Sequence, residues 1–166
     1  MGKTVFFIRH AKSSWNDPTL RDSQRPLNHR GLRNAPQMAA ILKEKIGNVD
    51  GLISSPAIRA FTTASYFANA FQIPAADIKR EPRIYEAFSG TLINLVRETR
   101  PDWDTVLFFG HNPGFTAVAN EFSSSYIDNV PTCGIVEIHL DADDWAQFGK
   151  AETKVLNFYY PKQFPK

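Results

Sequence analysis

The chain has 166 residues, of which 43% are hydrophobic and 22% charged, so it is long enough for one buried core and too short for two ordinary domains. This composition excludes a disordered chain. With 19 basic and 17 acidic residues the net charge is only +2, which argues against a nucleic-acid or membrane-surface binder and means that any selectivity for anions must be local.

The first predicted element is an apolar strand, Val5–Ile8, that ends abruptly in Arg9 and His10. In an α/β sheet the carboxyl end of a strand opens into the crevice where such folds bind ligands. Packing does not require an arginine and a histidine at this position. Both side chains are therefore expected to point into a site.

Apolar residues then recur at helical spacing and predict an amphipathic helix over about residues 30–46, with one face buried on the sheet. These residues are Leu32, Ala35, Ala39, Leu42 and Ile46. Pro36 lies inside this range and makes the start of the helix difficult to place.

A second strand and helix follow. The apolar segment Gly51–Ile53 predicts the strand, and Ser55 is the expected N-cap of the helix, with Pro56 at its first helical position. The apolar stripe of this helix is formed by Ala57, Phe61, Ala64, Ala68 and Phe71. Arg59 lies off the stripe and is expected to reach over the strand ends.

A second predicted strand with a histidine just after its end is Thr105–Phe109, which is followed by a Gly-His-Asn-Pro-Gly segment at residues 110–114. Its histidine is His111, and Gly110 and Gly114 are expected to allow close backbone approach, with a helix that begins near Pro113 offering its positive end. Two arginines and two imidazoles converging at strand ends predict a pocket for a tetrahedral dianion.

The last predicted strands are Ile135–Leu140 and Lys154–Tyr159, which are expected to pair with each other. His139 alternates with apolar neighbours and is interpreted as a solvent-side strand residue, and His29 as a helix-start or loop residue without a chemical role. Cys133 is interpreted as a buried structural thiol, and a single cysteine suits a reducing compartment.

Strands and helices alternate along the chain without a linker, a repeat or a low-complexity tract. The sequence therefore predicts a single α/β domain over residues 1–166, with a mostly parallel central sheet and helices on both faces. It contains no apolar run of 18 or more residues and no leader-like segment before the first strand, which predicts a cytoplasmic protein.

At this point a family resemblance emerges. Residues 9–16, Arg-His-Ala-Lys-Ser-Ser-Trp-Asn, resemble the Arg-His-Gly-x-Thr-x-x-Asn signature of the histidine phosphatase superfamily, which has the phosphoglycerate-mutase-like fold. Segments 25–31, 54–60 and 110–114 continue the match in order. The resemblance covers Val5 to about Phe122 and looks most like the small SixA-type phosphohistidine phosphatases. One departure is Ala11, where many members have glycine.

The resemblance implies a role for each residue of the predicted pocket. His10 would be the nucleophile that carries the phosphoryl group, and His111 the second imidazole, which donates to phosphoryl oxygens. Arg9 and Arg59 present forked donors that match two phosphate oxygens at once.

The remaining site residues have two interpretations each. Asn112 stands where a carboxyl group beside the second histidine would have identified the general acid. Glu86, similar to the glutamate that mutase-like members carry before a glycine, is the best candidate and Asp17 the weaker one; otherwise Glu86 is an exposed loop residue. Ser13 and Asn16 match the family's Thr and Asn positions as secondary phosphate contacts, or else serve as turn and cap residues.

The function predicted is a metal-independent phosphatase that works through phospho-His10, with protein phosphohistidine as the favoured substrate. An imidazole leaves phosphorus more readily than an alkoxide does, so such a substrate needs little help from an acid. The alternatives are a phosphatase of small phosphomonoesters and a non-catalytic phospho-residue binding module. No metal or other cofactor is expected because the four histidines lack ligand spacing. The partner is a phosphorylated protein or small molecule, not nucleic acid or membrane.

Overall fold

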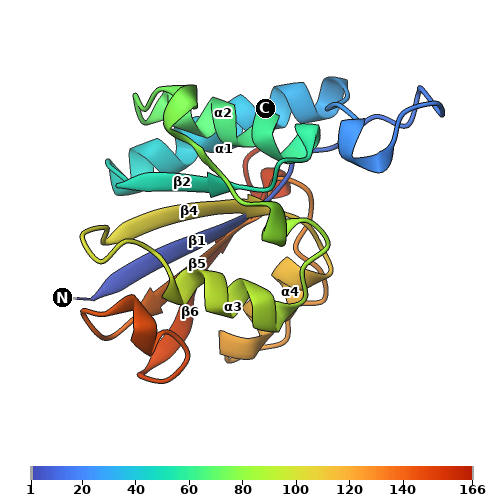
Figure 1. The fold of residues 1–166 in the computed structure, drawn as a ribbon. Coiled ribbons are helices and arrows are strands. Elements are labelled where there is room, and N and C mark those ends of the chain that lie inside the picture. Colours follow the sequence, from blue (N-terminus) through green and yellow to red (C-terminus); the bar gives the residue numbers. More distant parts are fainter. Residues whose placement is uncertain (1, 166) are drawn as a thin grey trace.

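Six strands within residues 2–165, the part of the chain that the computed structural model describes, form one mixed sheet in the order β3-β2-β4-β1-β5-β6 (Figure 1). Their bounds are β1 Lys3–Arg9, β2 Gly51–Ser54, β3 Lys79–Arg80, β4 Thr105–Gly110, β5 Ile135–Leu140 and β6 Thr153–Tyr159. Strands β3, β2, β4 and β1 are parallel neighbours, whereas β5 is antiparallel to both β1 and β6. The predicted mostly parallel central sheet is confirmed.

Helices cover both faces of this sheet, as predicted (Figure 1). One face carries α1 (His29–Ile46) and α2 (Ile58–Ala70), and the other carries α3 (Ser89–Arg97) and α4 (Gly114–Phe122). Short 3-10 helices, η1 to η5, lie at Asp22–Gln24, Ala75–Asp77, Pro82–Ile84, Trp145–Gln147 and Pro161–Gln163. No helix in residues 2–165 is both long enough and apolar enough to cross a membrane.

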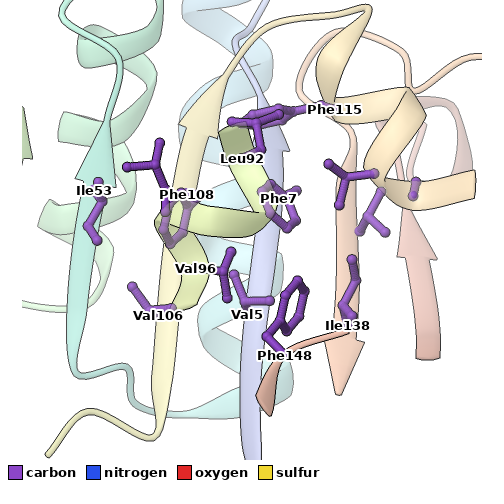
Figure 2. Packing of buried hydrophobic residues seen from close by; sticks show 14 of the residues in the cluster. Val5, Phe7, Ile53, Leu92, Val96, Val106, Phe108, Phe115, Ile138 and Phe148 are labelled. Carbon is purple, nitrogen blue, oxygen red and sulfur yellow. The ribbon is translucent and has the colours of Figure 1, made fainter. Parts of the chain in front are cut away.

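The central strand β1 is buried on both faces. Its side chains alternate, so Val5 and Phe7 face α3 and α4, while Phe6 and Ile8 face α1 and α2. Figure 2 shows the first of these layers, in which the Phe7 ring meets the Phe115 ring of α4 edge-on with centroids 5.0 Å apart. Packing on two sides therefore fixes the position of the strand whose end carries the candidate site.

Helix α1 confirms the prediction for residues 30–46. It begins at His29, which is exposed, and the Asn28 side chain caps it by accepting a hydrogen bond from the Gly31 N–H at 2.9 Å. Pro36 lies inside the helix. The helix therefore begins before the proline.

Helix α2 begins later than predicted. Ser55 is not its N-cap and Pro56 is not its first helical residue, because the helix begins at Ile58 with Ala57 at the N-cap position. The reason is that the Ser55 N–H donates to the Phe109 carbonyl at 2.9 Å, which continues the pairing of β2 with β4 by one residue. Ser55 is thereby held beside the strand end.

The carboxyl-terminal strands pair antiparallel, as predicted. His139 on β5 is partly exposed, with its Nδ1 3.3 Å from the Thr4 hydroxyl. Cys133 is buried, which raises the pKa of its thiol to about 12, and its N–H donates to the carbonyls of Arg9 and His10, each at 3.0 Å. Cys133 therefore has the structural role that the sequence predicts.

The start of α1 packs against the segment that follows His10, which makes Gly31 a test of this contact. A Cβ at Gly31 would collide with the Lys12 carbonyl, whereas one at Gly90, near the start of α3, meets open space. We expect Gly31→Ala to lower the free energy of unfolding by about 1 to 3 kcal/mol. Gly90→Ala should leave it unchanged or raise it by up to about 1 kcal/mol. Urea denaturation of both variants measures this, and equal effects would contradict the predicted collision.

Candidate active site

Two histidines meet at one edge of the sheet because their strands are neighbours. Strands β1 and β4 pair in parallel with Arg9 opposite Gly110, and a histidine follows each of them. The His10 N–H donates to the Gly110 carbonyl at 3.0 Å, and the ring centroids of His10 and His111 lie 5.3 Å apart. The predicted convergence of the two strand ends is present in the structure.

His10 is held as a neutral imidazole with one unprotonated nitrogen. Its Nδ1 lies 2.7 Å from the Ala11 carbonyl oxygen, and because a carbonyl only accepts, Nδ1 carries the proton. Burial lowers the pKa of His10 to about 3, and the charge of Arg59 contributes to the same effect. The bare Nε2 therefore faces the Nε of Arg59 at 3.4 Å.

Arg59 reaches from α2 over the strand ends, as the sequence predicts. It is buried, and while its Nε lies against His10, its Nη1 donates to the Asp22 backbone carbonyl at 2.6 Å. Its Nη2 donates to the Asp22 carboxylate at 2.9 Å. The guanidinium thus bridges η1 and the imidazole.

Asp22 is the site residue that sequence reasoning missed. Its carboxylate also accepts from the Tyr85 hydroxyl at 2.6 Å and from two guanidinium nitrogens of Arg25, each at 3.2 Å. Burial alone raises the pKa of Asp22, but the hydrogen bonds from Tyr85 and Arg59 hold it well below the usual range, so the group is ionised. The sequence indicates Asp22 only by its place three residues before Arg25, in a segment that has neither helical nor strand periodicity.

Arg9 and His111 each present a buried nitrogen that has no hydrogen-bond partner among residues 2–165. The Nη1 of Arg9 donates to the Val130 carbonyl at 3.0 Å, but its Nε is unpaired. The Nε2 of His111 lies 2.8 Å from the Ser55 hydroxyl, and its Nδ1 is unpaired. Burial lowers the pKa of His111 to about 4, with Arg59 contributing, so this imidazole is also neutral at neutral pH.

A cavity of about 300 Å³ opens beside these groups. Its lining consists of Asp22, Arg59, Tyr85, Glu86, Ala87, Phe88, His111, Asn112 and Pro113. Glu86 is exposed and adopts a φ of 60°. Asp17 is not part of the lining, and its carboxylate accepts from the N–H and hydroxyl of Thr19. Of the two predicted acids, the structure therefore brings Glu86 to the cavity.

Ser13 and Asn16 are not among the residues that line this cavity. Ser13 is buried and accepts from Nη1 of Arg25 at 2.7 Å, so it positions the arginine that holds Asp22. Asn16 is exposed, and its backbone N–H donates to the Ser14 hydroxyl at 3.1 Å. Direct contact of either residue with phosphate stays a prediction.

Other parts of the protein fill the space beside Gly110 and Gly114, where the sequence predicts close backbone approach. A Cβ at Gly110 would collide with the side chains of Ile84 and Phe115, and one at Gly114 with the Ala87 carbonyl. These glycines therefore pack the end of β4 and the start of α4 against the segment that follows β3.

The charge of the site suits an anion. Arg25 and Arg59 both donate to the Asp22 carboxylate, and Arg9 lies close enough to Arg59 for the two charges to repel, so the positive charges of this group exceed its negative charge. Guanidinium groups bind phosphate through paired donors. In residues 2–165 no group of three or more His, Cys, Asp or Glu side chains is placed to hold a metal ion.

The two neutral imidazoles predict how stability depends on pH. Because the folded pKa values of His10 and His111, about 3 and about 4, lie below that of an unfolded histidine, the unfolded state binds more protons as pH falls. Stability is therefore fully present above about pH 6.5 and is lost below it. We expect a loss of about 2 kcal/mol per imidazole between about pH 7.5 and about pH 5.

Denaturant unfolding across that range measures this loss. His111→Gln should remove about half of this loss, since His10 remains, whereas His29→Ala, at an exposed position, should keep all of it. A wild-type protein whose stability does not change over this range would contradict the neutral, buried imidazoles.

Known proteins resemble this chain along most of its length. Residues 5–125 match the model of the histidine phosphatase superfamily (branch 1). An uncharacterised protein of Mycobacterium tuberculosis is 28% identical over 165 residues, which cover 93% of this chain and 100% of that protein. An uncharacterised chloroplastic protein of Arabidopsis thaliana is 29% identical over 155 residues, covering 89% of this chain and 71% of that protein.

Solved structures share the fold. A proposed phosphohistidine phosphatase SixA from Agrobacterium tumefaciens matches with a TM-score of 0.80 at 25% identity, over 97% of this chain and 99% of that one. The protein histidine phosphatase SixA in complex with tungstate gives 0.82 at 21% identity, over 98% and 99% of the two chains. A mycobacterial glucosyl-3-phosphoglycerate phosphatase gives 0.68 at 12% identity, over 93% and 97%. Because the family model spans most of its length, this chain belongs to the histidine phosphatase superfamily.

Proposed function

We propose that this protein, a phosphatase by its family, removes phosphate from protein phosphohistidine through a phosphoryl-His10 intermediate. One observation carries this proposal: the Ala11 carbonyl holds Nδ1 of His10, which leaves a neutral Nε2 beside Arg59. A histidine attacks phosphorus only through an unprotonated nitrogen, so the buried, neutral state suits a nucleophile. In this proposal no metal is required, because guanidinium groups meet the phosphate charge.

The reaction has two steps that exchange the bonds at phosphorus. In the first, Nε2 of His10 attacks phosphorus, and the bond to the leaving group breaks with its electron pair, which takes up a proton. In the second, water attacks the phosphoryl group, releases a proton and restores Nε2 as orthophosphate leaves. Negative charge spreads over the equatorial oxygens in both steps. The unpaired Nε of Arg9 and Nδ1 of His111 are donors suited to that charge.

The carboxyl groups of the cavity favour a substrate whose leaving group is easily released. Asp22 is ionised and occupied by Arg59 and Tyr85, which makes it a poor proton donor. Glu86, the other carboxyl group in the lining, is exposed. An imidazole leaving group, with a pKa of about 6.5, needs far less protonation than an alkoxide. This supports a phosphoramidate substrate.

Exposed aromatic side chains near the site support a protein substrate. Phe88 lines the cavity with 78% of its surface exposed. Trp15 is 73% exposed, and the guanidinium of Arg25 stacks on its ring at 3.5 Å from the centroid. Aromatic residues are enriched where proteins meet. We therefore propose a phosphorylated protein as partner, in the cytoplasm, where the single buried thiol of Cys133 finds a reducing environment.

A second candidate is a phosphatase of small phosphomonoesters, and the place of Glu86 in the cavity lining favours it. A carboxyl group there could protonate an alkoxide as it leaves. The fold alone allows either substrate class, because structures that bear phosphohistidine phosphatase and glucosyl-3-phosphoglycerate phosphatase names share it.

The nucleophile can be tested directly. His10→Ala should abolish phosphate release from phosphohistidine, because it removes the imidazole whose unprotonated Nε2 lies against Nε of Arg59. His29→Ala, at the exposed start of α1, should keep wild-type activity. Wild type quenched in alkali during turnover should carry an acid-labile phosphoryl group at His10. Turnover by His10→Ala contradicts the covalent route, and a wild type that binds phosphohistidine without turnover is a binding module instead.

The substrate classes differ in their need for Glu86. If Glu86 is the proton donor, Glu86→Gln should slow hydrolysis of alkyl phosphates by about 10² to 10⁴-fold, the usual contribution of general acid catalysis. It should leave phosphohistidine hydrolysis almost unchanged. Asp17→Asn, whose carboxylate lies outside the cavity lining, serves as control. A wild type that cleaves alkyl phosphates faster than phosphohistidine would favour the small-molecule phosphatase, and equal losses on all substrates would give Glu86 a structural role.

A further inference from the structure

The Ser55 hydroxyl is held between α2 and the second imidazole. Ser55 is fully buried, and its Oγ lies 2.8 Å from Nε2 of His111 and 3.2 Å from the Ala57 N–H. The backbone of Ser55 is fixed as well, because its N–H donates to the Phe109 carbonyl and its carbonyl accepts from the Ser54 hydroxyl at 2.8 Å. The hydroxyl therefore meets the His111 ring at a defined position.

The hydrogen bonds of this hydroxyl determine which way it donates. A serine hydroxyl has one proton to give and two lone pairs that accept. The Ala57 N–H occupies one lone pair. Were Nε2 of His111 also a donor, the Ser55 proton would have no acceptor, because among residues 2–165 these are the two partners of Oγ. Donation from Ser55 to Nε2 gives the Ser55 proton an acceptor, so Nε2 carries no proton.

The proton of His111 then has one place left. The charges that face the ring are those of Arg59, Arg9 and Arg25, opposed by Asp22, and together with burial they keep the imidazole neutral at neutral pH. A neutral ring has a single N–H, which must lie on Nδ1. Nδ1 is buried and has no partner in the described part of the chain, an arrangement that costs free energy unless a ligand accepts from it.

We propose that Ser55 is a positioning residue whose hydroxyl keeps the His111 proton on Nδ1, the nitrogen that donates to the transferring phosphoryl group. This inference rests on the function proposed above. With the other tautomer, a lone pair on Nδ1 would face a dianion and repel it. Ser55 thus decides whether His111 stabilises negative charge or opposes it.

The tautomer can be measured without any turnover, from ¹H–¹⁵N correlation spectra of the imidazole nitrogens at neutral pH. The His111 signals are assigned by their loss in His111→Gln. We expect a protonated Nδ1 and a bare Nε2 in the wild type. Ser55→Ala should move the proton to Nε2 in a large share of molecules. Ser65→Ala, which removes a half-buried hydroxyl on α2 that donates to the Phe61 carbonyl at 2.9 Å, should keep the wild-type pattern.

Two outcomes of these spectra overturn the inference. One is a wild-type His111 protonated at Nε2. The other is an unchanged Nδ1–H form in Ser55→Ala. If that variant does not fold, Ser55→Cys replaces the hydroxyl with a weaker S–H donor and should give an intermediate population of the two tautomers.

Activity provides an independent readout. Loss of one preorganised donor typically costs about 10² to 10³-fold in kcat, and because the tautomers still interconvert we expect about 10- to 100-fold for Ser55→Ala. Ser65→Ala should change kcat by less than about threefold. In a His111→Gln background, Ser55→Ala should cause no further loss, because the two residues act as one unit. Equal losses in both backgrounds overturn the inference.

The inference and the proposed function can fail separately. A wild type that releases no phosphate from phosphohistidine or p-nitrophenyl phosphate overturns the proposed function. If the spectra of that same protein show the Nδ1–H tautomer and its loss in Ser55→Ala, they still support control of the tautomer by Ser55.

Discussion

The parallel register between β1 and β4 is the constraint on which the candidate site depends. Because Arg9 lies opposite Gly110, the residues that follow leave the sheet side by side. The ring centroids of His10 and His111, far apart in the sequence, therefore lie 5.3 Å apart. A slip of one residue would turn every side chain of a strand to the other face of the sheet. The large aromatic residues of both strands are fully buried, so packing forbids such a slip. The core therefore sets the geometry of the chemistry.

Burial of this cluster has opposite consequences for its imidazoles and its arginines. Histidines lose their proton when desolvated beside cations, which keeps His10 and His111 neutral in the absence of a ligand. Arginines keep their charge and take hydrogen bonds where the protein offers them. Asp22 supplies such a bond to Arg59 and so holds the guanidinium in place without phosphate. An incoming dianion would meet ordered side chains, and two of their buried nitrogens, Nε of Arg9 and Nδ1 of His111, have no hydrogen-bond partner within residues 2–165.

The cavity and its surroundings connect this cluster to a class of substrate. The Asp22 carboxylate forms ion pairs with Arg25 and Arg59, whereas the exposed Glu86 lines the same cavity. In the function proposed above, strong charge stabilisation and a weak supply of protons would suit phosphorus bonds to nitrogen better than bonds to alkoxide oxygen. The exposed ring of Phe88 at this cavity adds a surface that a protein could contact.

The sequence by itself determined part of the fold and the four central residues of the site, but it indicated neither β3 nor α3. Strand ends, helical spacing and short motifs are local patterns, so β1, β4, α1 and the placement of Arg9, His10, Arg59 and His111 could be predicted. Only the tertiary structure showed that Asp22 holds Arg59, 37 residues away, and that Ser55 contacts His111 instead of capping α2. Such contacts join segments that are distant in sequence and follow no periodicity. They arise when packing brings the segments together, so no pattern within a single segment records them.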